Sequence, residues 1–253
     1  MKQVVFIPAR LNSIRLPRKV LMDIHGIPML EHVRRRVLLS SNVSDVYIAT
    51  CDIEIKEVIS SFGGKVIMTD SNHTNGTSRV SEAVEKINCK NVLLVQGDEP
   101  LILPSQIDHF INELNIKCNF KMWNAVTPLK DMNDLNDTSQ VKCSIINSEI
   151  IYMYRKSPSE KLFVEQKKYI KKVLGLIGFE KSFLQKFSKS RSTLIEKIES
   201  IEQMKAIENG YRIGSIELNE NFPSINEKKD LKLVLDVLNK SQKQQDILKK
   251  YLN

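Results

Sequence analysis

Short apolar runs alternate with amphipathic segments through residue 130 of the chain. Four runs are typical of buried strands, and they span residues 3–8, 45–50, 65–69 and 92–95. Between them, apolar residues recur at helical spacing over residues 28–39, 53–62 and 77–87, the last with Thr77 or Ser78 near its N-cap. Strands that alternate with helices in this way predict a parallel sheet with right-handed crossovers.

The pattern changes after residue 120. Short strands are predicted over residues 123–127, 141–146 and 150–154, without a full helix between them. The polar, basic residues 156–172 predict an exposed or mobile loop. The pattern then predicts a strand over 173–179, a helix over 181–187, a helix over 198–210 that ends at Gly210, and a strand over 211–218. Residues 230–252 predict a terminal amphipathic helix with a break near Ser241.

Composition narrows the class of protein. Hydrophobic residues make up 42% of the 253 residues, enough for a sizeable core. No run approaches the ~18 apolar residues of a membrane span, and the first residues lack the pattern of a signal peptide. The four cysteines and four histidines are dispersed without a CxxC pair, which disfavours zinc and favours reduced thiols in the cytoplasm.

The net charge of +8 raises the question of nucleic-acid binding. The lysines concentrate in residues 156–172 and 228–250, where they alternate with Asp, Glu and Gln as on a solvated helix face. Aromatic residues, on which bases would stack, do not interleave with them. We therefore expect neither a nucleic-acid partner nor a membrane partner.

The segment Gln96-Gly97-Asp98-Glu99-Pro100 directly follows the predicted strand at 92–95. In open α/β sheets, ligands bind at the carboxyl ends of the strands. A carboxylate at such an end can hold Mg²⁺, which takes the rest of its ligands from water and substrate phosphates. Gly, Asp and Pro also form ordinary turns, so a plain turn explains this segment alone equally well.

A basic loop follows the first predicted strand. It runs from Pro8 to Lys19 and carries a hydroxyl at Ser13 and four cations, Arg10, Arg15, Arg18 and Lys19. Arg offers forked donors and Lys a compact charge, which suits a polyphosphate. A solvated basic loop is the alternative, but nucleotide-binding sheets carry their phosphate loops at this position. The glycines of a Walker A loop or a GxGxxG fingerprint are absent, which disfavours P-loop NTPases and dinucleotide enzymes.

Four segments carry a resemblance to a known family. Residues 8–19 match PARxxSxRLPxK, residues 73–79 match HxxGTxR, residues 95–100 match VQGDEP, and residues 199–211 are similar to ESLEQ…ENGY. In this order they resemble the CMP-Kdo synthetases (3-deoxy-manno-octulosonate cytidylyltransferases) of the CMP-sugar synthetase group. The resemblance implies an α/β fold: a three-layer αβα nucleotide-diphospho-sugar transferase (Rossmann-like) sheet with a small mixed-strand lobe. It implies one domain over residues 1–253, with a nucleotide-binding half at 1–130, a sugar-binding and dimerisation lobe at 131–225 and a C-terminal helix at 226–253.

The resemblance also implies an activity and its residues. CMP would pass from CTP to 3-deoxy-manno-octulosonate (Kdo) or a related acidic sugar, with release of pyrophosphate, in a Mg²⁺-dependent cytoplasmic homodimer of lipopolysaccharide biosynthesis. The implied catalytic residues are Arg10, Lys19 and Asp98, with Asp98 as the metal ligand. The implied substrate-binding residues are Ala9, Ser13, Arg15, His73, Gly76, Thr77, Arg79, Gln96, Lys142, Arg155, Glu202 and Gln203. Without the resemblance, Thr77 reads as a helix cap, and Glu202 and Gln203 read as polar residues on an exposed helix face.

The chain departs from the family pattern mainly in the part that would face the sugar. Asn226 stands where the family has a second metal-holding aspartate; it keeps a carbonyl ligand without the charge, and Glu227 beside it is the alternative. Val173 replaces a sugar-facing histidine, the 156–172 loop is short and basic, and Arg18 stands where the family usually has glycine. Two hypotheses therefore stay open: a synthetase for Kdo or a related acid, and a CTP-binding paralogue that activates a different acid or acts without catalysis.

Overall fold

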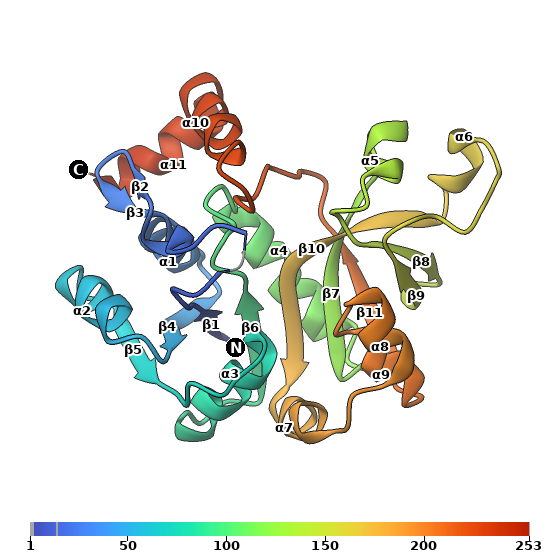
Figure 1. Ribbon diagram of the computed structural model, residues 1–253, viewed down its shortest axis with the longest axis horizontal. Helices are drawn as coiled ribbons and strands as arrows, with labels where there is room; N and C mark the ends of the chain where they lie inside the picture. Colours follow the sequence, from blue (N-terminus) through green and yellow to red (C-terminus); the bar gives the residue numbers. More distant parts are fainter. Residues whose placement is uncertain (1–2, 14, 253) are drawn as a thin grey trace. The chain divides into compact units, whose positions relative to one another are not determined.

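The computed structural model describes residues 3–13 and 15–252, and they form two compact units. The first unit comprises the chain up to residue 111 together with the segment from residue 222 onward, and the second comprises residues 112–221. Figure 1 traces both units in the order of the sequence. The expected halves at 1–130 and 131–225 differ from this division, because residues 112–130 lie in the second unit and the C-terminal helices lie in the first.

The first unit is built on a parallel sheet with the order β5-β4-β1-β6. Its strands are β1 (Gln3–Pro8), β4 (Val43–Thr50), β5 (Lys65–Met68) and β6 (Asn91–Val95). Each lies within a few residues of its predicted range, and the predicted parallel pairing is confirmed. The runs of β1, β4 and β6 are largely buried as expected, with Phe6, Ile48 and Leu93 all at 0% exposure, whereas the residues of β5 are exposed or half-buried.

Helices connect these strands or lie after the last of them in the chain. They are α1 (Met29–Leu38), α2 (Ile53–Ser61), α3 (Gly76–Ala83) and α4 (Pro104–Ile116), with α10 (Asp230–Lys240) and α11 (Gln242–Leu252) added from the end of the chain. A 3₁₀ turn (Lys19–Leu21) and a small hairpin, β2 (Asp23–Ile24) with β3 (Ile27–Pro28), join β1 to α1, and a second 3₁₀ turn (Val84–Lys86) follows α3. The predicted break near Ser241 is confirmed, because Ser241 has extended backbone between α10 and α11.

Five strands of the second unit pair in a closed ring. They are β7 (Met122–Pro128), β8 (Lys142–Ile146), β9 (Glu149–Tyr154), β10 (Ile170–Glu180) and β11 (Ile213–Glu217). The β11–β7 pair is parallel and the other pairs, including β10–β8, are antiparallel, so the expected mixed strands are present. The helices of this unit are α5 (Met132–Asn136), α6 (Phe163–Gln166), α7 (Lys181–Lys189), α8 (Leu194–Glu199) and α9 (Met204–Glu208).

The predicted helix over 198–210 is wrong, because the structure has two helices, α8 and α9, in this region. Ser200 ends α8 in the left-handed conformation, with φ 54°. The Arg155 guanidinium donates to the carbonyls of Glu199 and Ser200, at 3.0 and 3.3 Å. A helix leaves its last carbonyls without partners, so this distant cation stabilises the break. Gly210, with φ 75°, ends the segment as predicted.

Two further expectations need correction. The N-cap of α3 is Asn75, whose side chain accepts a hydrogen bond from Ser78 N at 2.8 Å; neither Thr77 nor Ser78 fills this position. The 156–172 segment, predicted as a loop, contains α6 and the first residues of β10. Within the described residues, no helix is both long and apolar enough to cross a membrane.

Candidate active site

A pocket with a volume of about 340 Å³ lies at the carboxyl ends of β1 and β6 in the first unit. This is the edge at which parallel sheets bind ligands. Its lining consists of Pro8, Ala9, Arg10, Ser13, Arg15, Lys19, Val20, His73, Asn75, Gly76, Arg79, Gln96, Gly97 and Asp98. Ten of the expected site residues are therefore together in one cavity, to whose lining both the basic loop and the Asp98 turn contribute.

Asp52 and Glu54, at the start of α2, contact Leu11 and Arg18 of the basic loop. Asp52 Oδ2 accepts from Leu11 N at 2.9 Å, and Leu11 O accepts from Arg18 N at 2.8 Å. Arg18 pairs with Glu54 on α2, outside the pocket lining. Its φ of 61° lies in the left-handed region, which explains why glycine suits this position. Of the four cations in the loop, three therefore line the pocket.

Lys19 and Asp98 form the polar centre of the pocket. Lys19 Nζ lies 2.6 Å from Asp98 Oδ2, and it also donates to Ile225 O at 3.1 Å. The two side chains are 13% and 23% exposed, so water only partly screens the pair. This pairing leaves a carboxylate and an ammonium together at the wall of a cavity that two further arginines of the basic loop also line.

Asn226 lies next to this centre. Ile225 N donates to Asp98 O at 3.0 Å, and Asn226 Oδ1 accepts from Arg15 at 3.1 Å. The two residues named as metal ligands therefore come from segments that contact each other. Glu227 Oε2 lies 3.0 Å from Lys229 Nζ. Among the residues that the structure describes, no group of three or more His, Cys, Asp or Glu could hold a metal ion by itself.

Glycines let the backbone approach closely at the wall lined by Gly76 and Gln96. A Cβ added to Gly76 would lie 2.8 Å from Pro8 Cγ, so a larger residue would push the first turn of α3 away from β1. Gly97 is also tight, because a Cβ at this position would lie 3.2 Å from Pro8 O. These contacts leave Gln96 and the start of α3 in the pocket lining.

A partly buried network orders the side chains on this wall. Arg79 is 3% exposed and donates to Thr69 Oγ1 at 2.6 Å and to Asp70 O at 3.4 Å. His73 Nε2 lies 2.5 Å from Glu82 Oε2, which also accepts from Asp70 N at 3.0 Å. Although partial burial opposes it, these hydrogen bonds hold the pKa of Glu82 below its usual value. Thr77 is 2% exposed and lies outside the pocket lining.

The other expected residues lie in the second unit. Lys142 is 0% exposed, and its Nζ donates to Asp137 O at 2.7 Å and to Gln140 O at 2.9 Å. Burial lowers the pKa of Lys142. Arg155 donates to two carbonyls of the same turn, those of Thr138 and Ser139, at 3.3 and 3.2 Å. The structure thus brings Lys142 and Arg155 to one turn.

Arg155 also binds the end of α8, just before Glu202 and Gln203. Gln203 Nε2 donates to Asn124 Oδ1 at 3.1 Å, and Asn124 on β7 is 0% exposed. Arg155 thus holds the turn that precedes Glu202 and Gln203, and Gln203 contacts β7 within the same unit.

Three supporting residues were not predicted: Asp52, Asn75 and Glu82. Asp52 lies two residues after the second strand and directly before α2, a position at which a carboxylate commonly accepts from backbone N–H groups. That signal was present in the sequence. Its contact with Leu11, 41 positions away, was not visible there.

Comparison with known proteins decides the family. Residues 4–213 match the family model described as cytidylyltransferase. This chain belongs to the cytidylyltransferase family. The predicted resemblance to CMP-Kdo synthetases and the predicted enzyme class, a nucleotidyltransferase, are confirmed.

Members with similar sequences carry two related names. The 3-deoxy-manno-octulosonate cytidylyltransferase of Geobacter metallireducens is 32% identical over 253 residues, covering 96% of this chain and 100% of the relative. The 8-amino-3,8-dideoxy-manno-octulosonate cytidylyltransferase of Shewanella pealeana is 34% identical over 239 residues, covering 92% of this chain and 97% of the relative.

Solved structures agree with the α/β nucleotide-diphospho-sugar transferase-like fold. CMP:2-keto-3-deoxy-manno-octonic acid synthetase complexed with CTP matches with a TM-score of 0.87 at 29% identity, over 94% of this chain and 99% of that chain. The 4-diphosphocytidyl-2C-methyl-D-erythritol synthase of Anaerococcus prevotii matches with a TM-score of 0.65 at 13% identity, over 94% and 99%, and shares the fold.

Proposed function

We propose that this chain transfers CMP from CTP to a Kdo-type sugar acid and releases pyrophosphate. The observation that carries the proposal is the pocket at the ends of β1 and β6, where three cations of the basic loop and the Asp98 carboxylate line one cavity. A nucleoside triphosphate bound with a divalent cation has the matching charges. The two named relatives and the CTP complex support this substrate class.

Arg10, Arg15 and Lys19 are suited to the triphosphate. Arg10 and Arg15 are exposed, so their guanidinium groups can reach phosphate oxygens, and Ser13 offers a hydroxyl in the same loop. In the reaction, a hydroxyl oxygen of the sugar bonds to the α-phosphorus, and the bond from that phosphorus to pyrophosphate breaks. The hydroxyl proton passes to water in the solvent. Arg10 and Lys19 would stabilise the charge that accumulates on the α-phosphate and the leaving group.

Mg²⁺ fits the donor set at the centre of the pocket. Asp98 supplies a hard carboxylate oxygen, and Asn226 supplies a carboxamide oxygen from the segment that contacts Asp98. One carboxylate is compatible with Mg²⁺, because this ion is usually held by one or two carboxylates together with substrate phosphates. When bound, the ion would polarise the phosphate oxygens.

The wall formed by α3 suits the nucleoside. Gly76 permits close approach of backbone groups, and Gln96, Arg79 and His73 offer polar atoms at the same wall. Cytosine needs both donors and acceptors along its edge, which this mixture provides. Thr77 would act by shaping the first turn of α3 from its buried position.

For the acidic sugar we propose Arg155, Glu202 and Gln203 as contacts in the second unit. Lys142 would contribute positive potential while its ammonium orders the 137–140 turn. The identity of the acid is a choice between Kdo and its 8-amino analogue, the two acids in the names of the relatives.

A substrate panel tests the proposal. Pyrophosphate release is measured with CTP, Mg²⁺ and each of Kdo, 8-amino-Kdo and a neutral hexose as acceptors, and with UTP in place of CTP as a control. We expect turnover with CTP and at least one of the two acids, and none with the hexose or with UTP. CTP binding without turnover on any acid would support the non-catalytic paralogue, and absence of CTP binding would reject the nucleotide site.

A homodimer and a cytoplasmic role in lipopolysaccharide biosynthesis are part of the same proposal. Several large apolar side chains of the second unit are exposed, among them Leu194 and Ile198 on α8, both at 71%. Such side chains suit contact with a second copy. All four cysteines are free thiols, which suits a reducing compartment. Light scattering coupled to size exclusion would give the mass directly, and a mass near that of one chain would reject the dimer.

A further inference from the structure

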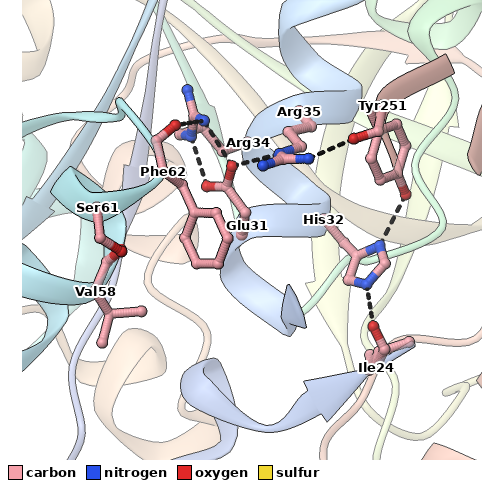
Figure 2. A network of polar contacts seen from close by, with 9 residues as sticks. All are labelled: Ile24, Glu31, His32, Arg34, Arg35, Val58, Ser61, Phe62 and Tyr251. Carbon is pink, nitrogen blue, oxygen red and sulfur yellow. Dashed lines mark hydrogen bonds and ion pairs between the residues drawn. The ribbon is translucent and has the colours of Figure 1, made fainter. Parts of the chain in front are cut away.

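A network of buried, hydrogen-bonded side chains links α11 to α1 in the first unit. Figure 2 shows His32 of α1 between two oxygens: its Nδ1 lies 2.8 Å from the Tyr251 hydroxyl and its Nε2 lies 2.6 Å from the Ile24 carbonyl. Because a carbonyl can only accept, Nε2 carries the proton and Nδ1 accepts from Tyr251. Burial lowers the pKa of His32 to about 4, which keeps the imidazole neutral at pH 7 and preserves this direction.

The Tyr251 hydroxyl also connects to Arg36. Arg36 Nε donates to the Tyr251 hydroxyl oxygen at 3.0 Å, and Arg36 NH1 donates to Gln244 Oε1 at 2.6 Å and to Ile102 O at 3.5 Å. Gln244 Nε2 donates in turn to Leu101 O at 2.9 Å. These hydrogen bonds connect Leu101 and Ile102, through α11 and Arg36, to Ile24.

The two ends of this hydrogen-bonded network are close in sequence to Lys19 and Asp98. Ile24 ends the short segment that begins with Lys19, and Leu101 and Ile102 follow Asp98 by three and four positions. Lys19 and Asp98 meet at 2.6 Å. Apolar packing follows the same route, because Ile27 and Leu103 form one core cluster with Ile247 and Tyr251.

The buried charge of Arg36 is energetically unfavourable, which indicates that this network does more than stabilise the fold. Arg36 is 0% exposed, and its hydrogen-bond partners are a hydroxyl, an amide and a backbone carbonyl. Its NH2 nitrogen has no hydrogen-bond partner among the residues that the structure describes. Burial lowers the pKa of Arg36 accordingly. A buried charge with neutral partners is a costly way to join two helices, and apolar side chains of similar volume would do so at lower cost.

We propose that Gln244 and Tyr251 of α11 are positioning residues that set the geometry between Lys19 and Asp98. They act through Arg36 and His32 on the backbone of the two segments that carry this pair. The expected changes in kcat and Mg²⁺ dependence rest on the proposed function. The expected change in backbone hydrogen exchange can be measured without any substrate.

Two substitutions separate positioning from stability. Tyr251→Phe removes the hydroxyl shared by His32 and Arg36 and keeps the ring in its apolar cluster. Gln244→Glu gives Arg36 a carboxylate partner but removes the donor to Leu101 O, so it should keep or raise the melting temperature while releasing the Asp98 segment. Matched controls are Tyr47→Phe in β4, whose ring stacks on Phe6, and Gln245→Glu on α11, whose side-chain amide donates to Asn239 O.

We expect both test variants to lower kcat about ten-fold and to raise the Mg²⁺ concentration needed for half-maximal rate, with a smaller change in the KM for CTP. Hydrogen–deuterium exchange should quicken at residues 19–24 in Tyr251→Phe and at residues 99–103 in both variants, while the two controls match the wild type. Unchanged kcat, Mg²⁺ dependence and exchange in both segments would overturn the proposal, even if the melting temperature fell. If the wild type turned over no acid, the proposed function would fail, and the exchange data alone would still decide the positioning.

Discussion

The cations of the two units have different surroundings. Arg10 and Arg15 in the first unit are exposed at the wall of a pocket, so their charge is available to a ligand. Lys142 and Arg155 in the second unit already donate to backbone carbonyls, two for Lys142 and four for Arg155. A motif match alone treats these cations alike. Arg10 donates to Thr74 O at 3.5 Å and Arg15 to Asn226 Oδ1 at 3.1 Å. The first set therefore keeps exposed donors for an anion, whereas the second set holds more of the backbone in place.

The largest expected effect falls on the carboxylate of the pocket. Asp98→Ala should lower kcat by more than about 100-fold, because the reaction loses the carboxylate that lines the pocket and Lys19 loses its partner. The backbone bond from Ile225 N to Asp98 O stays, so the far-ultraviolet circular dichroism should match the wild type. Pyrophosphate release gives the rate. A variant that keeps most of its rate would place the metal elsewhere.

Substituting methionine for one cation in each unit tests directly whether the two sets of cations have different roles. Lys142→Met should lower the free energy of unfolding by about 1–3 kcal/mol, because two carbonyls lose their donor inside the protein. Arg10→Met should change it by less than about 0.5 kcal/mol and should raise the KM for CTP. Urea denaturation and steady-state kinetics measure the two effects. Equal stability of both variants would remove the distinction between the two sets of cations.

Acid should weaken the first unit through His32. Its folded-state pKa of about 4 lies below the ordinary 6.5, so the unfolded chain binds this proton more tightly. Stability is therefore complete above pH 6.5 and falls as the pH drops towards 4, by about 1.4 kcal/mol per pH unit. Burial is the main cause, and the charges of Arg36, His25 and Arg35 add to it.

Denaturation of wild type and His32→Gln between about pH 7 and pH 5 measures this contribution. The wild type should lose about 2 kcal/mol over this range, and the variant should lack that part of the slope. An identical slope in both proteins would show that another group titrates.

Arg18 offers a smaller test, on the base of the basic loop. Arg18→Gly should be more stable than Arg18→Ala by about 1 kcal/mol, because only glycine adopts the left-handed conformation freely. The KM for CTP should stay close to that of the wild type in both variants, since the Arg18 side chain pairs with Glu54. A large rise in KM would mean that Arg18 reaches the nucleotide.

The smallest effect is expected at Asn226. Asn226→Asp should leave kcat equal or raise it by a factor of about three or less, because a carboxylate adds charge for Mg²⁺ without a change in size. A Mg²⁺ titration of the rate should shift to lower concentrations. A large loss of activity would show that the amide is adapted to its contact with Arg15.

The sequence predicted the parts of this molecule that depend on local patterns. The apolar runs gave the four strands of the first unit, and the four motifs led to ten residues that line one pocket. The helix α4 was missed although Ile107, Phe110, Ile111 and Leu114 recur at helical spacing and are all buried, so this signal was available.

What the sequence could not supply were contacts between distant positions. The break between α8 and α9 depends on Arg155, which is 45 positions from Ser200. The base of the basic loop depends on Asp52, and the ordering of His73 depends on Glu82. Local propensity has no access to such partners, because each of these residues alone is compatible with a solvated surface.

The division of the first unit between two stretches of chain has a consequence for its synthesis. Residues 112–221 are synthesised before α10 and α11. The strands of the first unit therefore emerge from the ribosome well before these two helices of the same unit. Ile27 and Leu103 pack against Ile247 and Tyr251 of α11 in the finished protein, so we expect them to lack this cover during that interval. We therefore expect nascent chains stalled before residue 242 to be a target for chaperones that bind exposed apolar surface.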